Sequence, residues 1–194
     1  MSQPDLFGPA SSLPRGLLYR ENFITQEEED ALLATIRTLP LSEARYRQYT
    51  ARRRTINYGA AYDFQQHKAT PAPALPVFLV PLRQRAAQWV NVAPSDFVQA
   101  LIAEYQPGTP LGWHRDVPNY EIIVAISLAA TCRIRFRRYP WNPAEKKDIF
   151  VIEPAPRSAY VLRDDARWKW QHSVPAVKEL RYSITLRTAR RFKE

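Results

Sequence analysis

Short strand-like runs separated by turns fill the second half of the chain, and they constrain the fold more than any other feature. Eight such runs follow one another within roughly 90 residues from Phe97 onward. Each is rich in β-branched and aromatic residues. The runs cover 98–105, 112–116, 121–128, 133–138, 149–153, 159–162, 171–174 and 182–187. This pattern favours a double-sheet jelly roll or barrel over a parallel α/β sheet.

The first half of the chain predicts helices. Thr25 and Glu28 form a capping box, and apolar residues at helical spacing continue this helix to about residue 39, before Pro40 ends it. A second helical pattern covers 79–90. A first strand is expected over 16–23, and strand-forming residues occupy 45–64. The predicted fold class is therefore α+β, with N-terminal helices leading into a double-stranded β-helix, or jelly roll.

The length of 194 residues, 45% of them hydrophobic, is typical of one globular domain and leaves no room for a second. We expect residues 1–14 to be a disordered lead-in. Residues 15–96 are expected to form the N-terminal helical region, and residues 97–194 the jelly-roll core. The two regions are expected to make one structural domain.

The chain is strongly basic, with 28 Lys and Arg against 19 Asp and Glu and a net charge of +9. This balance favours a polyanionic partner such as nucleic acid. The single cysteine, Cys132, excludes a disulfide framework and a zinc site of several cysteines. No apolar run approaches ~18 residues and no signal pattern begins the chain, so we expect a cytoplasmic monomer without membrane association.

A small group of metal-ligating residues stands out among the predicted strands. His114 and Asp116 are two residues apart, which places both side chains on one face of a strand. His172 lies on a later strand that a jelly roll can bring alongside. Two His and one Asp are the set that holds non-haem Fe(II) with coordination positions left open. The competing interpretation is a chance His-x-Asp pair and an unrelated core or surface histidine.

The last predicted strand has a polar face with a cation at each end. Arg181, Ser183, Thr185 and Arg187 share this face, and the residues between them are apolar. Two unpaired guanidinium groups inside a barrel would be costly, and a dianionic ligand would offset that cost. A dicarboxylate that chelates iron and meets an Arg bidentately is the 2-oxoglutarate arrangement. The alternative is an amphipathic strand with its polar face in water.

The order of these motifs resembles the AlkB family of Fe(II)/2-oxoglutarate dioxygenases, which remove alkyl groups from nucleic-acid bases. The similarity extends over residues 16–190 and is most specific from residue 101 onward. The residues that carry it are Leu101-Ile102, Tyr105-x-Pro107-Gly108, His114-x-Asp116, Ser127-Leu128, His172 and Arg181-x-Ser183-x-Thr185-x-Arg187.

The resemblance implies an iron centre, a 2-oxoglutarate pocket and consumption of O2. The implied reaction is oxidative dealkylation of bases in DNA or RNA, as in DNA repair, with release of aldehyde, succinate and CO2. The implied roles are His114, Asp116 and His172 as catalytic iron ligands, Arg181 on the distal carboxylate of 2-oxoglutarate, and Tyr105 and Arg187 completing its pocket.

Two positions depart from the family pattern. Ala103 stands where the family often has an Asn, so one amide contact to the cosubstrate is missing. Pro118 stands where several members have an acidic residue that reads the base. Base preference therefore cannot be transferred from the family.

The resemblance also assigns 45–64 to a nucleotide-recognition lid. The substrate-binding residues expected there are Arg52, Arg53 and Arg54, which can neutralise phosphates, and Tyr58, Tyr62 and Phe64, which can stack on bases. A solvated basic turn followed by core aromatics is the competing interpretation. Arg133, Arg135 and Arg137 form a second basic stripe, which a solvated sheet face would also explain. Residues 167–170 are expected either to border the mouth of the site or to pack beneath it.

Two other functions remain open at this point. The same oxidative residues could serve a 2-oxoglutarate-dependent hydroxylase that acts on a protein or a small molecule. A basic barrel that binds nucleic acid without catalysis would explain the charge, but it would leave the inward Arg pair and the His/Asp group unexplained.

Overall fold

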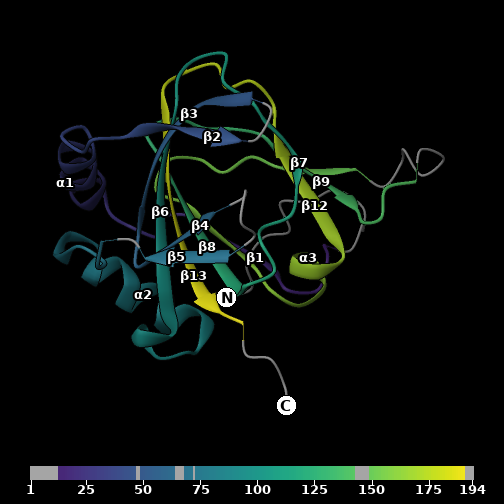
Figure 1. Ribbon diagram of the computed structural model, residues 1–194, viewed down its shortest axis with the longest axis horizontal. Coiled ribbons are helices and arrows are strands. Elements are labelled where there is room, and N and C mark those ends of the chain that lie inside the picture. The colour runs from purple at the N-terminus through teal and green to yellow at the C-terminus, as the bar shows by residue number, and fades with distance from the viewer. Residues whose placement is uncertain (1–12, 47–48, 64–67, 72, 143–148, 191–194) are drawn as a thin grey trace, which may run out of the picture.

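The computed structural model describes residues 13–46, 49–63, 68–71, 73–142 and 149–190. Almost all of the expected lead-in, 1–14, therefore lies outside the described residues. Two antiparallel sheets face one another and form the expected jelly roll, and helices cover the outer face of the larger sheet (Figure 1). The α+β fold class is thus confirmed.

The larger sheet has seven strands in the order β1-β11-β8-β13-β6-β3-β2. Its strands are β1 Leu17–Arg20, β2 Ser42–Tyr46, β3 Tyr49–Tyr58, β6 Phe97–Tyr105, β8 Tyr120–Leu128, β11 Ala159–Leu162 and β13 Arg181–Ala189. The central strand β13 pairs with β6 on one side and with β8 on the other. The polar face predicted for β13 therefore lies in the middle of this sheet.

The smaller sheet has four strands in the order β10-β9-β12-β7. Its strands are β7 Leu111–His114, β9 Ile134–Arg138, β10 Phe150–Ile152 and β12 Trp170–Val174. A separate hairpin pairs β4 Ala60–Asp63 with β5 Lys68–Pro71. All eight strands expected after residue 97 are present, but β7 ends at His114, so Asp116 lies beyond the strand that was expected to carry it.

Both expected helices are present. They are α1 Gln26–Ile36 and α2 Val80–Val90, and α1 begins with the capping box between Thr25 and Glu28. Two short 3-10 turns cover Val77–Leu79 and Pro94–Asp96. A third helix, α3 Asp164–Trp168, was not expected. None of the described helices is long and apolar enough to cross a membrane.

Side-chain alternation along β13 separates two apolar cores. Tyr182, Ile184 and Leu186 pack into the core beneath α1 and α2. The opposite face, with Arg181 and Arg187, lines a cavity between the two sheets, and the second core surrounds that cavity. The sequence alternation therefore directs both arginines into the interior rather than into water.

Candidate active site

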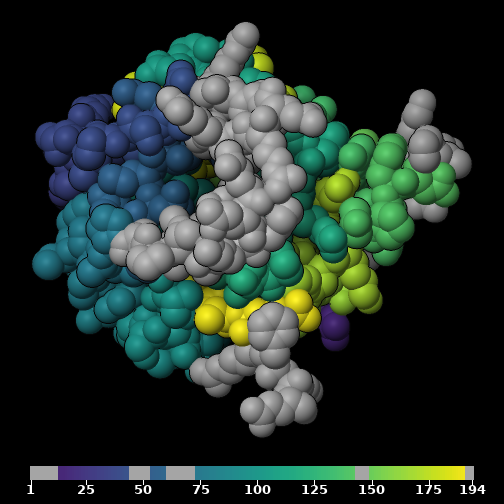
Figure 2. All heavy atoms as spheres, viewed as in Figure 1, coloured from purple at the N-terminus to yellow at the C-terminus, as the bar shows by residue number. Residues whose placement is uncertain are grey.

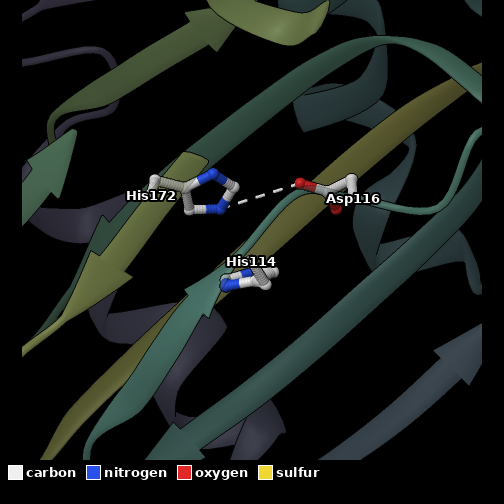
Figure 3. A group of neighbouring side chains, drawn as sticks. All are labelled: His114, Asp116 and His172. Carbon is white, nitrogen blue, oxygen red and sulfur yellow. Dashed lines mark ion pairs between the residues drawn. The ribbon is translucent and has the colours of Figure 1, made fainter. Parts of the chain in front are cut away.

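The two histidines and the aspartate of the predicted metal group meet in the cavity between the sheets (Figure 3). Strands β7 and β12 pair so that His114 and His172 are direct neighbours, with ring centroids 4.2 Å apart. Asp116 follows β7, and its Oδ2 lies 3.7 Å from Nε2 of His172. Candidate ligand atoms of all three lie within 4.8 Å of one another. A single cation can therefore contact all three.

Each histidine is held by its surroundings. Nδ1 of His114 lies 2.9 Å from the carbonyl oxygen of Gly112. Because a carbonyl only accepts, Nδ1 carries the proton, and Nε2 keeps its lone pair for a metal. The ring of Phe136 lies 6.0 Å from that of His172 and stacks on Phe150 at 4.7 Å. This apolar support limits rotation of the His172 ring.

Asp116 is oriented by Arg187. Nε and Nη2 of Arg187 donate to Oδ1 of Asp116 at 2.9 and 2.5 Å, and Nη1 donates to Oε1 of Gln99 at 2.7 Å. Both partners of the ion pair are nearly buried, and Gln99 is the cross-strand neighbour of Arg187. Arg187 thus lines the expected pocket, but its guanidinium holds the candidate metal carboxylate and leaves Oδ2 facing His172.

A second arginine fixes the backbone around Asp116. Arg167, on α3, is 2% exposed. Its Nη2 donates to the carbonyl oxygens of Asp116, Val117 and Tyr120 at 3.2, 2.7 and 3.0 Å, and Nε donates to that of Tyr120. Of the segment 167–170, Arg167 therefore packs beneath the site, whereas Lys169 is exposed. No sequence pattern indicates this role, because the acceptors are backbone atoms.

Substitution of Arg167 should weaken metal binding while the fold survives. Lysine keeps the charge but has no planar group that can reach several carbonyl oxygens at once. We expect Arg167→Lys to lower affinity for a divalent cation about tenfold to hundredfold, the usual effect of losing an outer-shell partner. Isothermal titration with Mn²⁺ measures it. Arg163→Lys, on a half-buried neighbour, is the control, and equal affinity in the two variants would contradict the role.

The opposite end of the cavity is built around Arg181. This side chain is 2% exposed, its Nε donates to Oγ of Ser127 at 3.3 Å, and it lies over the ring of Tyr105 at 5.2 Å. Tyr160 also lines this end, and burial raises the pKa of its hydroxyl above the usual range. Among the described residues, no carboxylate pairs with Arg181. A buried guanidinium without a carboxylate partner among the described residues fits an anionic ligand.

Electrostatics favour the protonation states that bind a cation. Burial alone would raise the pKa of Asp116, but Arg187 and the two histidines outweigh it and hold this pKa well below its usual range. Burial lowers the pKa of His172 to about 3, and it also lowers that of His114. Near neutral pH the carboxylate is ionised and both imidazoles are neutral, the forms that metals bind.

The expected arginine cluster of the lid is divided by strand alternation. Arg53 points to the cavity, where its Nη1 donates to the hydroxyl of Tyr105 at 3.5 Å. Arg54 points to the other face and forms a bidentate ion pair with the buried Glu104 at 2.8 Å, since the two are register partners on β3 and β6. The side chain of Arg52 lies outside the described residues. A phosphate role for Arg54 would require breaking this pair.

Of the aromatic residues expected in the lid, only Tyr58 has a described side chain. Tyr58 is 7% exposed and packs into the core beneath the helices. The expectation that it stacks on a base is therefore corrected, because its ring lies within the apolar core. Tyr62 is on β4, but its side chain and all of Phe64 lie outside the described residues. At the two positions that depart from the family pattern, Ala103 lines the cavity and Pro118 is exposed.

Comparison with known proteins adds an independent finding. The family model described as the 2OG-Fe(II) oxygenase superfamily matches residues 16–190. The protein named "Alkylated DNA repair protein ALKBH8 homolog" from Arabidopsis thaliana is 29% identical over 199 residues. This match covers 91% of the chain and 56% of the relative, so the chain spans little more than half of that protein's length.

Two solved structures share the fold. The structure of OsALKBH1 superposes with a TM-score of 0.73 at 14% identity, covering 91% of this chain and 97% of that one. A Pseudomonas putida prolyl-4-hydroxylase superposes with a TM-score of 0.60 at 17% identity, covering 91% and 94%. At these identities the likeness concerns the fold alone.

Proposed function

Because the chain belongs to the 2OG-Fe(II) oxygenase superfamily, we propose that this dioxygenase removes alkyl groups oxidatively from the bases of DNA or RNA. The observation that carries the proposal is the similarity to an AlkB homologue over 91% of the chain. That length includes the residues before β6, whose strand β3 joins the larger sheet and supplies Arg53 to the cavity wall. Residues of this wall lie apart from the groups that would bind iron and 2-oxoglutarate, so we expect them to determine which substrate is accepted.

The site residues fit the cofactors that the family uses. His114, Asp116 and His172 would hold Fe(II), and three protein ligands leave positions open for cosubstrate and O2. Arg181 would bind the distal carboxylate of 2-oxoglutarate, because it is buried, planar and without a carboxylate partner among the described residues. Bound together, Fe(II), 2-oxoglutarate and O2 supply the oxidation of a C–H bond.

The protein's own groups orient these components and keep water out. Arg187 holds Oδ1 of Asp116 so that the other carboxylate oxygen faces His172. Ile123, Ile134 and Leu162 form an apolar part of the cavity wall between the two charged ends. The ring of Tyr105 lies against the guanidinium of Arg181, and its hydroxyl accepts a hydrogen bond from Arg53, so Tyr105 links the cosubstrate end to the wall that Arg53 lines.

The overall reaction balances without a further reagent. An N-methyl base, O2 and 2-oxoglutarate give the unmodified base, formaldehyde, succinate and CO2. The N-methyl carbon gains one oxygen atom as a hydroxyl, and the C–N bond then breaks with a proton returning to the base nitrogen. The target base must leave its stack to reach a cavity enclosed by two sheets.

A second candidate is a hydroxylase of protein side chains. The fold shared with a prolyl-4-hydroxylase favours it, since the same jelly roll is compatible with that substrate class. A barrel without catalysis, the third possibility raised by the sequence, is no longer supported, because the family is one of oxygenases.

Product release from defined substrates tests the proposal. We expect formaldehyde and succinate in equal amounts from at least one oligonucleotide in a panel of methylated single- and double-stranded DNA and RNA. The unmethylated oligonucleotide of the same sequence is the control, and it should give succinate only at the uncoupled rate. Succinate release that responds to a proline-rich peptide and to no methylated oligonucleotide would replace the proposal with the hydroxylase.

A further inference from the structure

The outer face of the smaller sheet carries an arrangement of cations and aromatic rings that the catalytic site does not use. We call it the Arg–Trp face and define it by Arg135 and Arg137 of β9, Trp113 of β7 and Trp141. The guanidinium of Arg137 lies over both tryptophan rings, at 4.3 Å from Trp113 and 4.6 Å from Trp141. That of Arg135 lies 5.1 Å from Trp113. In Figure 2 the green segment that includes β9 forms a lobe on the side away from α1 and α2.

The charges of this face are not neutralised within the described part of the chain. Arg135 donates to the hydroxyl of Ser173 at 3.1 Å, and Arg137 donates to the side-chain oxygen of Gln171 at 2.9 Å. Both acceptors are neutral, whereas the neighbouring Arg133 pairs with Glu153. Burial and the nearby Arg135 lower the pKa of Arg137. Two like charges are thus held close together, and an added anion would relieve their repulsion.

The face is built on the strands that carry the metal site. Phe136 lies between the two arginines and turns inward against His172, while Ser173 and Gln171 flank that histidine on β12. Trp113 precedes His114 on β7. Sheet alternation therefore presents metal ligands on one surface and the Arg–Trp face on the other. A nucleic-acid strand with one base in the cavity would have this charged surface on the other side of the smaller sheet.

The chemistry of the face matches single-stranded nucleic acid. Guanidinium groups bind phosphate bidentately, and tryptophan rings offer flat surfaces on which unstacked bases of any sequence can stack. Arginine already stacked on an aromatic ring loses little rotamer freedom when it binds a phosphate. A purely acidic peptide would use the charges but would bring no ring that stacks on the tryptophans.

We propose that the Arg–Trp face is an accessory surface that binds the backbone and unpaired bases of single-stranded nucleic acid beyond the nucleotide in the cavity. This inference rests on the proposed nucleic-acid substrate and adds the surface that retains it. The face raises affinity without selecting sequence, since phosphates and stacking carry no base code. It takes no part in the oxidation.

Fluorescence anisotropy with a labelled single-stranded DNA 20-mer at several salt concentrations tests the face. We expect Arg135→Gln/Arg137→Gln to reduce the slope of log affinity against log salt by about 1.4 units, or 0.7 for each lost phosphate contact. At about 0.1 M salt this corresponds to roughly 25-fold weaker binding. Succinate release in the absence of oligonucleotide should equal that of the wild type.

Three further variants separate the effect of charge, the effect of stacking and the effect of losing arginines elsewhere on the surface. Arg135→Lys/Arg137→Lys should keep the wild-type slope, because both charges remain. Trp141→Ala should weaken binding about tenfold with an unchanged slope, because stacking does not release counterions. Arg20→Gln/Arg37→Gln removes two exposed arginines of β1 and the end of α1, and it should match the wild type apart from small long-range effects.

The outcomes distinguish the face from the proposed function. A Gln double variant that binds like the Arg20/Arg37 control would overturn the face, while formaldehyde release by the wild type would still support dealkylation. Loss of slope in a protein that demethylates no oligonucleotide would keep the face and reject dealkylation. Displacement of the DNA by polyglutamate of equal charge and concentration would show a general anion surface, and it would also overturn the proposal.

Discussion

Asp116→Asn should abolish turnover and lower the affinity for Fe(II) more than about hundredfold. Loss of an outer-shell partner usually costs 10–100-fold in metal affinity, so loss of a charged ligand should cost more. The substitution also removes the charge that balances Arg187, and it leaves a nearly buried guanidinium facing a neutral amide. Succinate formation should fall to the background of the assay.

Metal titration and succinate release together measure this effect. Mn²⁺ titration reports binding without turnover, and circular dichroism confirms that the variant is folded. Asp165→Asn is the matched control, because Asp165 is paired with Arg15 and Lys169 at the surface and away from the cavity. If the Asp116 variant bound Mn²⁺ as the control does, Asp116 would not be a ligand.

Arg181→Lys should raise the concentration of 2-oxoglutarate needed for half-maximal rate by about tenfold or more, which corresponds to roughly 1.4 kcal/mol. Lysine keeps the charge but not the planar two-point contact with a carboxylate. Arg181→Gln should have a larger effect, on the order of 100-fold or roughly 2.7 kcal/mol, because a buried carboxylate then loses the buried guanidinium that binds it. Saturating 2-oxoglutarate should restore most of the rate in the Lys variant.

The titration needs a control for changes in the sheet. Arg133→Lys changes an exposed arginine that directly precedes β9 and pairs with Glu153, and it should leave the 2-oxoglutarate curve unchanged. Mn²⁺ affinity should be the same in the Arg181 variants and the wild type, since the candidate metal ligands lie at the other end of the cavity. A wild-type 2-oxoglutarate curve for Arg181→Gln would remove the residue from the cosubstrate pocket.

The parts of the site that follow strand alternation could be predicted from the sequence. The spacing of Arg181 and Arg187 placed both on one face of β13, and the structure directs that face into the cavity rather than into water. Alternation is a local property of the backbone, so a single strand is enough to reveal it. The eight-strand pattern likewise favoured a jelly roll or barrel, and the two observed sheets are those of a jelly roll.

The parts that depend on long-range contacts could not be predicted. Arg54 and Glu104 are register partners on strands far apart in sequence, and no local pattern shows that one would bind the other. The burial of Tyr58 depends on α1 and α2 packing over β3. Asp116 was expected on a strand, but β7 ends two residues earlier, and its place depends on Arg187 and Arg167 instead.

Because Arg167 holds the backbone after Asp116, selection for metal binding at Asp116 and selection for a substrate at residue 118 can act separately. Its contacts are with main-chain carbonyls, so they do not depend on which side chains residues 117–119 carry. Pro118, at the position where the family resemblance places a base-reading residue, is exposed and makes no part of that support. Substitutions at residue 118 can therefore accumulate and be selected for a new substrate while Asp116, the candidate iron ligand two residues earlier, keeps its place.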